Sequence, residues 1–171
     1  AFVGQEWCRP CERGAHGAAL VDRATFDCHG GYATSWYHSV GRVQRSTLDG
    51  AVYSEAEVDH YDDTVFLEND VISGGIGSMY GTLFVRNSVV AGGVSLTTAY
   101  AATTIESSVL RDATCAVTAD SADFVVRNTL FWNDTANACG TFLDPVGTND
   151  DAAADPLFTD AAHGDFTLQP G

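Results

Sequence analysis

Lysine is absent from this chain, although the chain carries 23 acidic residues. All eight basic residues are arginines, and the formal net charge is -15 at pH 7. A surface that binds nucleic-acid phosphates needs clustered Lys and Arg, so this balance argues against a nucleic-acid partner. It suits a well-solvated exterior or a site for divalent cations.

Long apolar runs are absent too. No stretch reaches the about 18 consecutive apolar residues of a transmembrane helix, so the sequence predicts no membrane span. No basic and apolar leader precedes Ala1, and we expect any export signal to lie outside this sequence. The 171 residues suffice for one domain with a core of its own.

A repeat runs through the chain. Six segments align without gaps, with starts at residues 21, 43, 67, 85, 105 and 126. They read VDRATF, VQRSTL, LENDVI, VRNSVV, IESSVL and VRNTLF. The segments are short, rich in β-branched residues and bounded by Gly, Asp, Asn and Ser, which favours strands over helices. Short strands at a period near 21 residues predict an all-β fold, a β-solenoid whose coils stack on one another.

Two columns of the repeat are apolar in every segment, and a third is polar. The first column is Val21, Val43, Leu67, Val85, Ile105 and Val126, and the last is Phe26, Leu48, Ile72, Val90, Leu110 and Phe131. The polar column begins with two arginines and continues as Asn69, Asn87, Ser107 and Asn128. Asn tolerates the left-handed conformation at a turn, and stacked amides can bond along an axis. We therefore expect these four residues to form a buried ladder in the core, which the two arginines of the first two coils interrupt.

The segments VRNS, VRNT and LEND resemble strands of the right-handed parallel β-helix of the pectin-lyase-like superfamily. The closing segment DPLFTDAAHGDFTLQPG resembles the end of bacterial surface-associated β-helix repeat proteins. The resemblance covers residues 20–171 and implies a right-handed parallel β-helix of about six to seven coils, located outside the cell or on a bacterial cell surface. It says less about activity, because the superfamily includes lyases, hydrolases and adhesins.

Three regions are expected along the chain. Residues 1–19 form a lead-in or a first partial coil, residues 20–152 form the coils, and residues 153–171 form two closing strands around Leu157 and Phe166. Each end of a solenoid exposes unpaired backbone and a section of the apolar core. We expect copies of this chain, or other parts of a longer polypeptide, to cover the coil ends.

The five cysteines suggest disulfides. Cys115 and Cys139 are 24 residues apart, close to one coil, and neighbouring coils bring Cα atoms to the distance that a disulfide needs. Cys28 follows Cys11 by 17 residues and Cys8 by 20, so the spacing lets either pair with it, and Cys11 and Cys28 are named as candidates for a second disulfide.

Zinc is the alternative for the first group of cysteines. The second close-spaced ligand pair of a typical zinc finger is missing, so a disulfide with one leftover thiol is preferred. The candidate zinc ligands are Cys8, Cys11, His16, Cys28 and His29.

Aromatic, acidic and histidine residues gather in the long excursions of the first two coils. His38 and His60 fall at the same position of their coils, counted from the first apolar column. Flat rings beside carboxylates are typical of carbohydrate grooves. The predicted ligand-binding residues are Trp36, Tyr37, His38, Tyr53, His60 and Tyr61. Ca2+ is the cofactor that the site could take, through Asp59, Asp62 and Asp63.

Three classes of function fit these features. A polysaccharide lyase or hydrolase acting on acidic glycans could use paired carboxylates, or Ca2+ with an arginine base. However, VDHYDD lacks the Trp-Ile of the pectate-lyase stretch, and Asp62-Asp63 and His29-Gly30 do not complete the polygalacturonase patterns. The other classes are a non-catalytic scaffold or adhesin and a glycan- or Ca2+-binding module. We assign no catalytic residue and favour the extracellular scaffold or adhesin.

Overall fold

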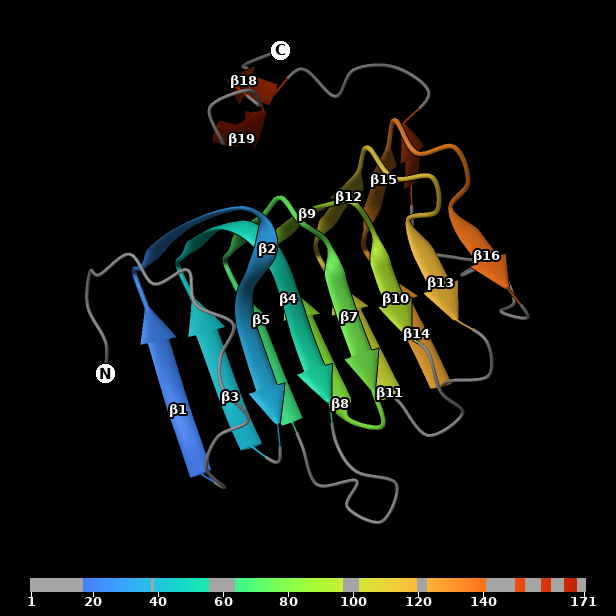
Figure 1. Cartoon of the computed structure of the whole chain (residues 1–171). Coiled ribbons are helices and arrows are strands. Elements are labelled where there is room, and N and C mark those ends of the chain that lie inside the picture. The colour runs from blue at the N-terminus through green and yellow to red at the C-terminus, as the bar shows by residue number, and fades with distance from the viewer. Residues whose placement is uncertain are drawn as a thin grey trace.

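The computed structural model describes residues 17–37, 39–55, 64–96, 102–119, 123–140, 150–152, 158–160 and 165–168. Every regular element in these ranges is a β-strand. The strands stack in parallel from one coil to the next as a β-solenoid, as Figure 1 shows from the first strand in blue to the last coil in orange. The predicted fold class, an all-β parallel solenoid, is confirmed.

One sheet contains the strand that opens each coil, and we call it the first sheet. Its six strands follow one another without a break, and all five pairings are parallel. In order they are β1 (Gly17–Asp22), β3 (Ser39–Gln44), β5 (Thr64–Glu68), β8 (Thr82–Arg86), β11 (Ala102–Glu106) and β14 (Asp123–Arg127).

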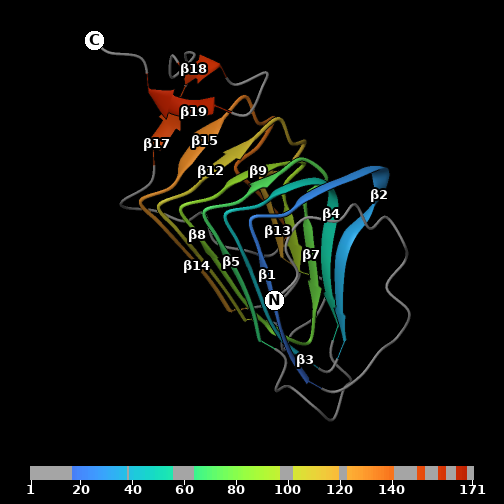
Figure 2. The same cartoon turned by 90° about the vertical axis from the view of Figure 1, so that its left-hand side faces the viewer.

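A second, strongly bent sheet contains the rest of each coil. Its middle strands are β6 (Val71–Ile72), β9 (Val89–Ala91), β12 (Val109–Arg111), β15 (Leu130–Trp132) and β17 (Asp150–Ala152). Its last strands are β7 (Ile76–Met79), β10 (Val94–Leu96), β13 (Val117–Ala119) and β16 (Ala138–Gly140). In the first two coils the long strands β2 (Thr25–Tyr37) and β4 (Thr47–Glu55) span both positions. The view along the axis in Figure 2 shows how these strands enclose the core.

Four coils therefore have three separate strands, and two earlier coils have two. Counted as complete three-strand turns, the solenoid has about four, slightly fewer than the six to seven coils predicted. Strand β1 begins at Gly17, a little before the predicted start of the coils.

The strand register agrees with the gapless alignment in all six coils. Val21 is paired with Val43 and Val43 with Leu67, and the pairing continues through Val126. The last column is paired in the same way from Phe26 to Phe131. Both columns belong to or pack against one apolar core, because strand alternation turns every second side chain inward. The register holds in the first two coils as well, despite their arginines.

The predicted buried ladder is wrong in one respect. Asn69, Asn87, Ser107 and Asn128 do stack in successive coils, and each adopts a left-handed conformation with φ between 48° and 59°. Their side chains, however, are exposed. A single left-handed residue turns the chain from the first sheet into the second, and at this corner its side chain points away from the core. The sequence therefore predicted the left-handed turn correctly, but the predicted burial of these four side chains is wrong.

The buried polar column lies one residue further along each segment. Its members are Ser46, Asp70, Ser88, Ser108 and Thr129, and each is at most 4% exposed. The backbone N–H of Ser46 donates to Asp70 Oδ1 at 2.8 Å, that of Asp70 to Ser88 Oγ at 3.2 Å, and that of Ser88 to Ser108 Oγ at 3.2 Å. Each serine hydroxyl in turn donates to the carbonyl oxygen two residues before it. This polar column therefore links the coils at the corner, and it provides partners for backbone groups that are shielded from water.

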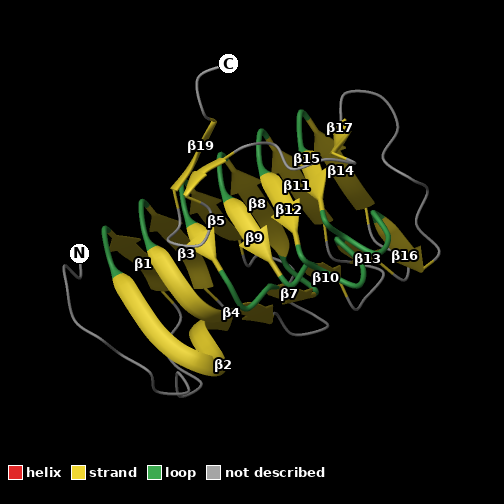
Figure 3. Ribbon diagram, turned by 90° about the horizontal axis from the view of Figure 1, so that it is seen from above, coloured by secondary structure: helices red, strands yellow, loops and turns green. Residues whose placement is uncertain are grey.

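The two closing strands are present as an antiparallel hairpin of β18 (Phe158–Asp160) and β19 (Asp165–Leu168). The Phe158 ring packs edge-on against Trp132 of β15, with ring centroids 5.3 Å apart. The Arg111 guanidinium lies 5.0 Å from the Trp132 ring centroid. Phe158 thus brings the hairpin into contact with the last coil, and Figure 3 shows from above that β19 extends back over the earlier coils.

Candidate functional site

The predicted aromatic and acidic rim lies only partly within the described residues. His38 and residues 56–63 lie outside them, and so do the predicted ligands Asp59, His60, Tyr61, Asp62 and Asp63. The backbone of Trp36 and Tyr37 belongs to β2, where Trp36 is paired with Ser54 of β4. Ser35 is paired with Tyr53, so the register brings the aromatic positions of the first two coils onto adjacent strands.

Tyr53 is the one predicted ligand-binding residue whose side chain the structure describes. It lies between the buried residues Val52 and Ser54 on β4, so its ring is on the outer face of the solenoid. A methyl group at Gly77 would lie 3.0 Å from Tyr53 Cδ2, which shows that the ring lies across this glycine of the next coil. Gly77 thus leaves room for the Tyr53 ring on the outer surface.

A second surface, which the sequence analysis did not single out, is the outer face of the first sheet. We call it the β1–β14 face. Two of its outward columns are Leu20, Arg42, Phe66, Phe84, Thr104 and Val125, and Ala18, Val40, Thr64, Thr82, Ala102 and Asp123. Arg42 and Asp123 are the charged residues of these two columns. A third outward column, Asp22, Gln44, Glu68, Arg86, Glu106 and Arg127, is charged at every position but one. The first column directly precedes the apolar column of each repeat, so the alignment does contain this signal.

An arginine and two phenylalanines stack along the axis on this face. The Phe66 and Phe84 rings are 5.0 Å apart between centroids, and their planes differ by only 9°. The Arg42 guanidinium lies over Phe66 at 4.6 Å from the ring centroid, and the Arg86 guanidinium lies 5.7 Å from the centroid of Phe84. Because equivalent residues of neighbouring coils repeat at the strand spacing, the rings meet face to face.

The charged groups beside this stack neutralise one another. Arg42 forms an ion pair with Glu68. Glu106 lies between Arg86, at 3.0 Å, and Arg127 on the next strand. These pairs are partly exposed, and each contributes at most about 1 kcal/mol to stability. Their chief effect is that the guanidinium groups already have carboxylate partners.

Asp70 is the buried acid of the polar column. Its side chain is 1% exposed, and it accepts backbone N–H bonds from Ser46 and, at 3.0 Å, from Glu68. Burial raises the pKa of Asp70 to about 7, and the neighbouring Glu68 charge adds to the rise, while the two N–H donors oppose it. A serine occupies this position in the coils on either side. Asp70 therefore brings a titratable group into a column that is otherwise built of hydroxyls.

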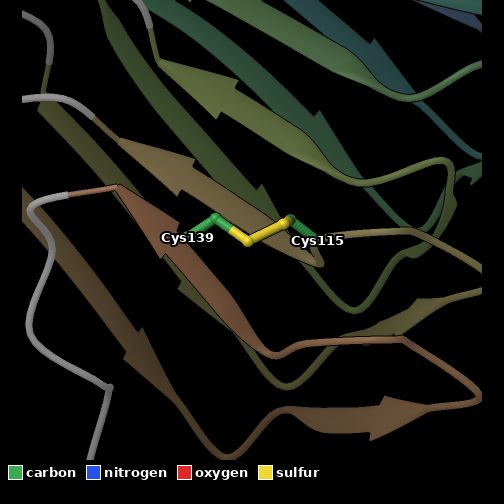
Figure 4. The surroundings of a disulfide bond; sticks show 2 residues. All are labelled: Cys115 and Cys139. Carbon is green, nitrogen blue, oxygen red and sulfur yellow. A yellow bond between two sulfur atoms is a disulfide. The ribbon is translucent and has the colours of Figure 1, made fainter.

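The predicted Cys115–Cys139 disulfide is present, with Cα atoms 5.9 Å apart (Figure 4). It joins the turn before β13 to β16, the outermost strand of the second sheet. Cys28 is disulfide-bonded as well. Because a disulfide sulfur is not a thiolate ligand, a disulfide at Cys28 and the alternative zinc site exclude one another. Within the part of the chain that the structure describes, no three His, Cys, Asp or Glu side chains are grouped so that they could hold a metal ion.

Comparison with known proteins gives no match: no family model, no curated protein and no solved structure is significantly similar to this chain. The described residues contain no helix that is long and apolar enough to cross a membrane. The class that the fold defines is a disulfide-containing parallel β-solenoid with two distinct outer surfaces, the Tyr53 platform and the β1–β14 face.

Proposed function

We propose that this protein is an extracellular or cell-surface scaffold with an adhesive role, a right-handed β-helix of the pectin-lyase-like type. The observation that carries the proposal is the unbroken first sheet, in which six parallel strands continue from coil to coil without a bulge. The buried polar column and the continuous apolar core run along the same axis. A protein built in this way is a stiff rod that presents its outer residues at regular spacing, which suits adhesion.

The disulfides support a location outside the cytoplasm. Disulfides persist in oxidising compartments and are rare where cellular thiols keep cysteines reduced. Cys28, Cys115 and Cys139 are the three cysteines among the described residues, and all three are disulfide-bonded. An acidic, lysine-free surface is compatible with a cell-surface location but does not by itself require one.

Cleavage of an acidic glycan is the competing function. The experiment that separates the two incubates the purified protein with polygalacturonate, alginate and uncharged polysaccharides, each with Ca2+ and with EDTA. Ultraviolet absorbance of unsaturated products and a reducing-end assay report cleavage. Depletion of the protein from solution, measured with those polysaccharides that are insoluble, reports binding.

A scaffold or adhesin is expected to bind without releasing product. Turnover of any of these polymers would contradict the proposal and favour the lyase or hydrolase. Sedimentation velocity on the same sample tests the proposed partners at the coil ends, because stacked copies give a series of species whose population rises with concentration.

A further inference from the structure

The middle strands of the second sheet carry an apolar strip on their outer side. Its members alternate with buried core residues along each strand, so they point outward, and each is half-buried. They are paired in register from coil to coil as Val71, Val89, Val109 and Leu130, and we call them the β6–β15 strip. Single apolar residues on a surface are common, but an unbroken outward row of aliphatic side chains marks a contact surface.

The β18–β19 hairpin lies over this side of the solenoid. Figures 2 and 3 both place the hairpin on the outer side of the middle strands of the second sheet. Phe158 at the start of β18 is 7% exposed, and its ring centroid lies 5.3 Å from that of Trp132, on the strand that also carries Leu130. The next two residues of β18, Thr159 and Asp160, are exposed. Phe158 is therefore the buried side chain that anchors β18 to the coils.

The described strands of the hairpin are not part of either sheet of the solenoid. Strands β18 and β19 form a separate sheet in which they pair with one another. A hairpin of two strands is at best marginally stable by itself, so side-chain contacts with the coils must hold it in place. Within the part of the chain that the structure describes, the hairpin can therefore leave the solenoid without breaking any strand pairing of the coils.

A second copy of this chain supplies an identical hairpin for the strip. Exchange of the same element between two protomers reuses the contacts of the closed monomer, which makes it a low-cost route to a dimer. Five residues, 153–157, connect β17 to β18, and Pro156 is one of them. Proline restricts the backbone, and a short, stiff connection favours exchange over closure within one molecule.

Other occupants fit the strip less well. An unrelated protein would have to displace the hairpin from a row of four strands that is only about 14 Å long, and a membrane of anionic lipid would meet a protein of charge -15. We propose that the β6–β15 strip binds the β18–β19 hairpin of a second copy, so that two copies exchange their hairpins and form a closed dimer. The exchanged hairpins form a contact separate from the coil ends, and it does not depend on the proposed adhesive function.

The test mixes two variants that each damage one side of the contact. Phe158→Ala removes the anchor of the hairpin, and Trp132→Ala removes the ring that the anchor meets. Neither variant can form the intact contact alone, whereas a mixture can form it between unlike molecules. The matched control mixes Phe158→Ala with Phe84→Ala, which removes a half-buried outward ring of the first sheet. Sedimentation velocity and native mass spectrometry measure the species, and circular dichroism verifies the fold of each variant.

The wild type is expected to form a dimer whose fraction rises with concentration and with added salt, since salt screens the like charge of the two copies. The mixture of Phe158→Ala and Trp132→Ala is expected to form a heterodimer at least tenfold tighter than the wild-type dimer, because the exchange then restores a contact that neither monomer has. The control mixture is expected to associate no more tightly than the wild type.

A longer connection gives a second measurement that leaves the contact residues unchanged. Insertion of a Gly and Ser stretch between Ala153 and Ala154 is expected to return the wild-type dimer to monomer, because a long, flexible connection lets the hairpin close on its own strip. A wild type that stays monomeric at every concentration would overturn the exchange, and so would a dimer that the insertion leaves unchanged or a variant mixture no tighter than the wild type. A series of larger species that no variant changes would also overturn it, and would leave the proposed scaffold and its coil-end partners intact.

Discussion

Replacing Asp70 by serine is expected to stabilise the protein at neutral pH, and the gain is expected to disappear in acid. Serine is the residue at this position in the preceding and the following coil, where its hydroxyl accepts one backbone N–H and donates to one carbonyl. Asp70→Ser therefore continues an existing hydrogen-bond pattern and removes the only carboxyl group from the buried polar column.

The sign and size of the effect follow from the raised pKa. An Asp with a usual pKa of 3.8 titrates near pH 7 in the folded protein, so the folded state keeps a proton that the unfolded state releases. The contribution of Asp70 to the free energy of unfolding therefore falls as the pH rises from about 4 to about 7, and it is level above that range. The pKa difference corresponds to at most about 4 kcal/mol. We expect Asp70→Ser to gain between about 1 and 4 kcal/mol at pH 8, since relaxation around the charge lowers its cost. At pH 4 both side chains are largely neutral, and the two proteins should differ by about 1 kcal/mol or less.

Urea unfolding followed by tryptophan fluorescence, at several values of pH across this range, measures the difference. Asp27→Ser is the matched control, because it removes the same formal charge from an exposed strand position. It should leave the pH dependence of the wild type in place. A wild-type–Asp70→Ser difference that is constant between pH 4 and pH 8 would refute the reasoning, because the burial of a charge would then not be its source.

Three further predictions concern the turn, the core and the disulfide. Asn87 has a φ of 48°, so in urea unfolding Asn87→Gly should change the free energy of unfolding by less than about 1 kcal/mol, whereas Asn87→Val should lower it by about 1–2 kcal/mol. Equal changes in the two variants would mean that the left-handed conformation does not matter at this position. Leu110→Ala should cost about 2–5 kcal/mol, because this fully buried side chain leaves a cavity between coils, and a loss below about 1 kcal/mol would contradict its place in the core. Cys115→Ser/Cys139→Ser removes the disulfide between two residues that are 24 positions apart, and it should lower the free energy of unfolding by about 3 kcal/mol in the chain-entropy description. Amide hydrogen exchange in this variant should be faster in β16 than in β7. Peptide mapping without reductant should recover these two cysteines joined, and free thiols at both would exclude the bond.

The repeat made most of the fold predictable. Val43 and Leu67 begin their segments 24 residues apart, and Leu67 and Val85 only 18 apart, yet all three are paired in register. Coils of different length can stack because only the strand residues have to be in register. The spacing of Cys115 and Cys139 could be interpreted for the same reason, since one coil separates two residues that are neighbours along the axis.

The candidate surfaces were less accessible to sequence reasoning. A cluster such as Trp36, Tyr37 and Tyr53 attracts attention because its residue types are those of sugar sites, whereas Phe66 and Phe84 are ordinary strand residues. Their stacking becomes visible only when the register and the outward direction of both side chains are known together. The pairing of Arg86 and Arg127 with Glu106 is likewise a property of neighbouring strands that are 20 residues or more apart in the chain.

The sequence by itself determined which residues share a column, because stacking equivalent positions is the one arrangement that buries both apolar columns of every segment at once. Only the tertiary structure decided which residue at the corner faces inward. The alternation of a strand stops where a left-handed residue turns the chain, so Asn87 points outward and Ser88 inward, although both are polar. The same corner places Asp70 away from water between two backbone donors, and this environment, not the residue type, raises its pKa.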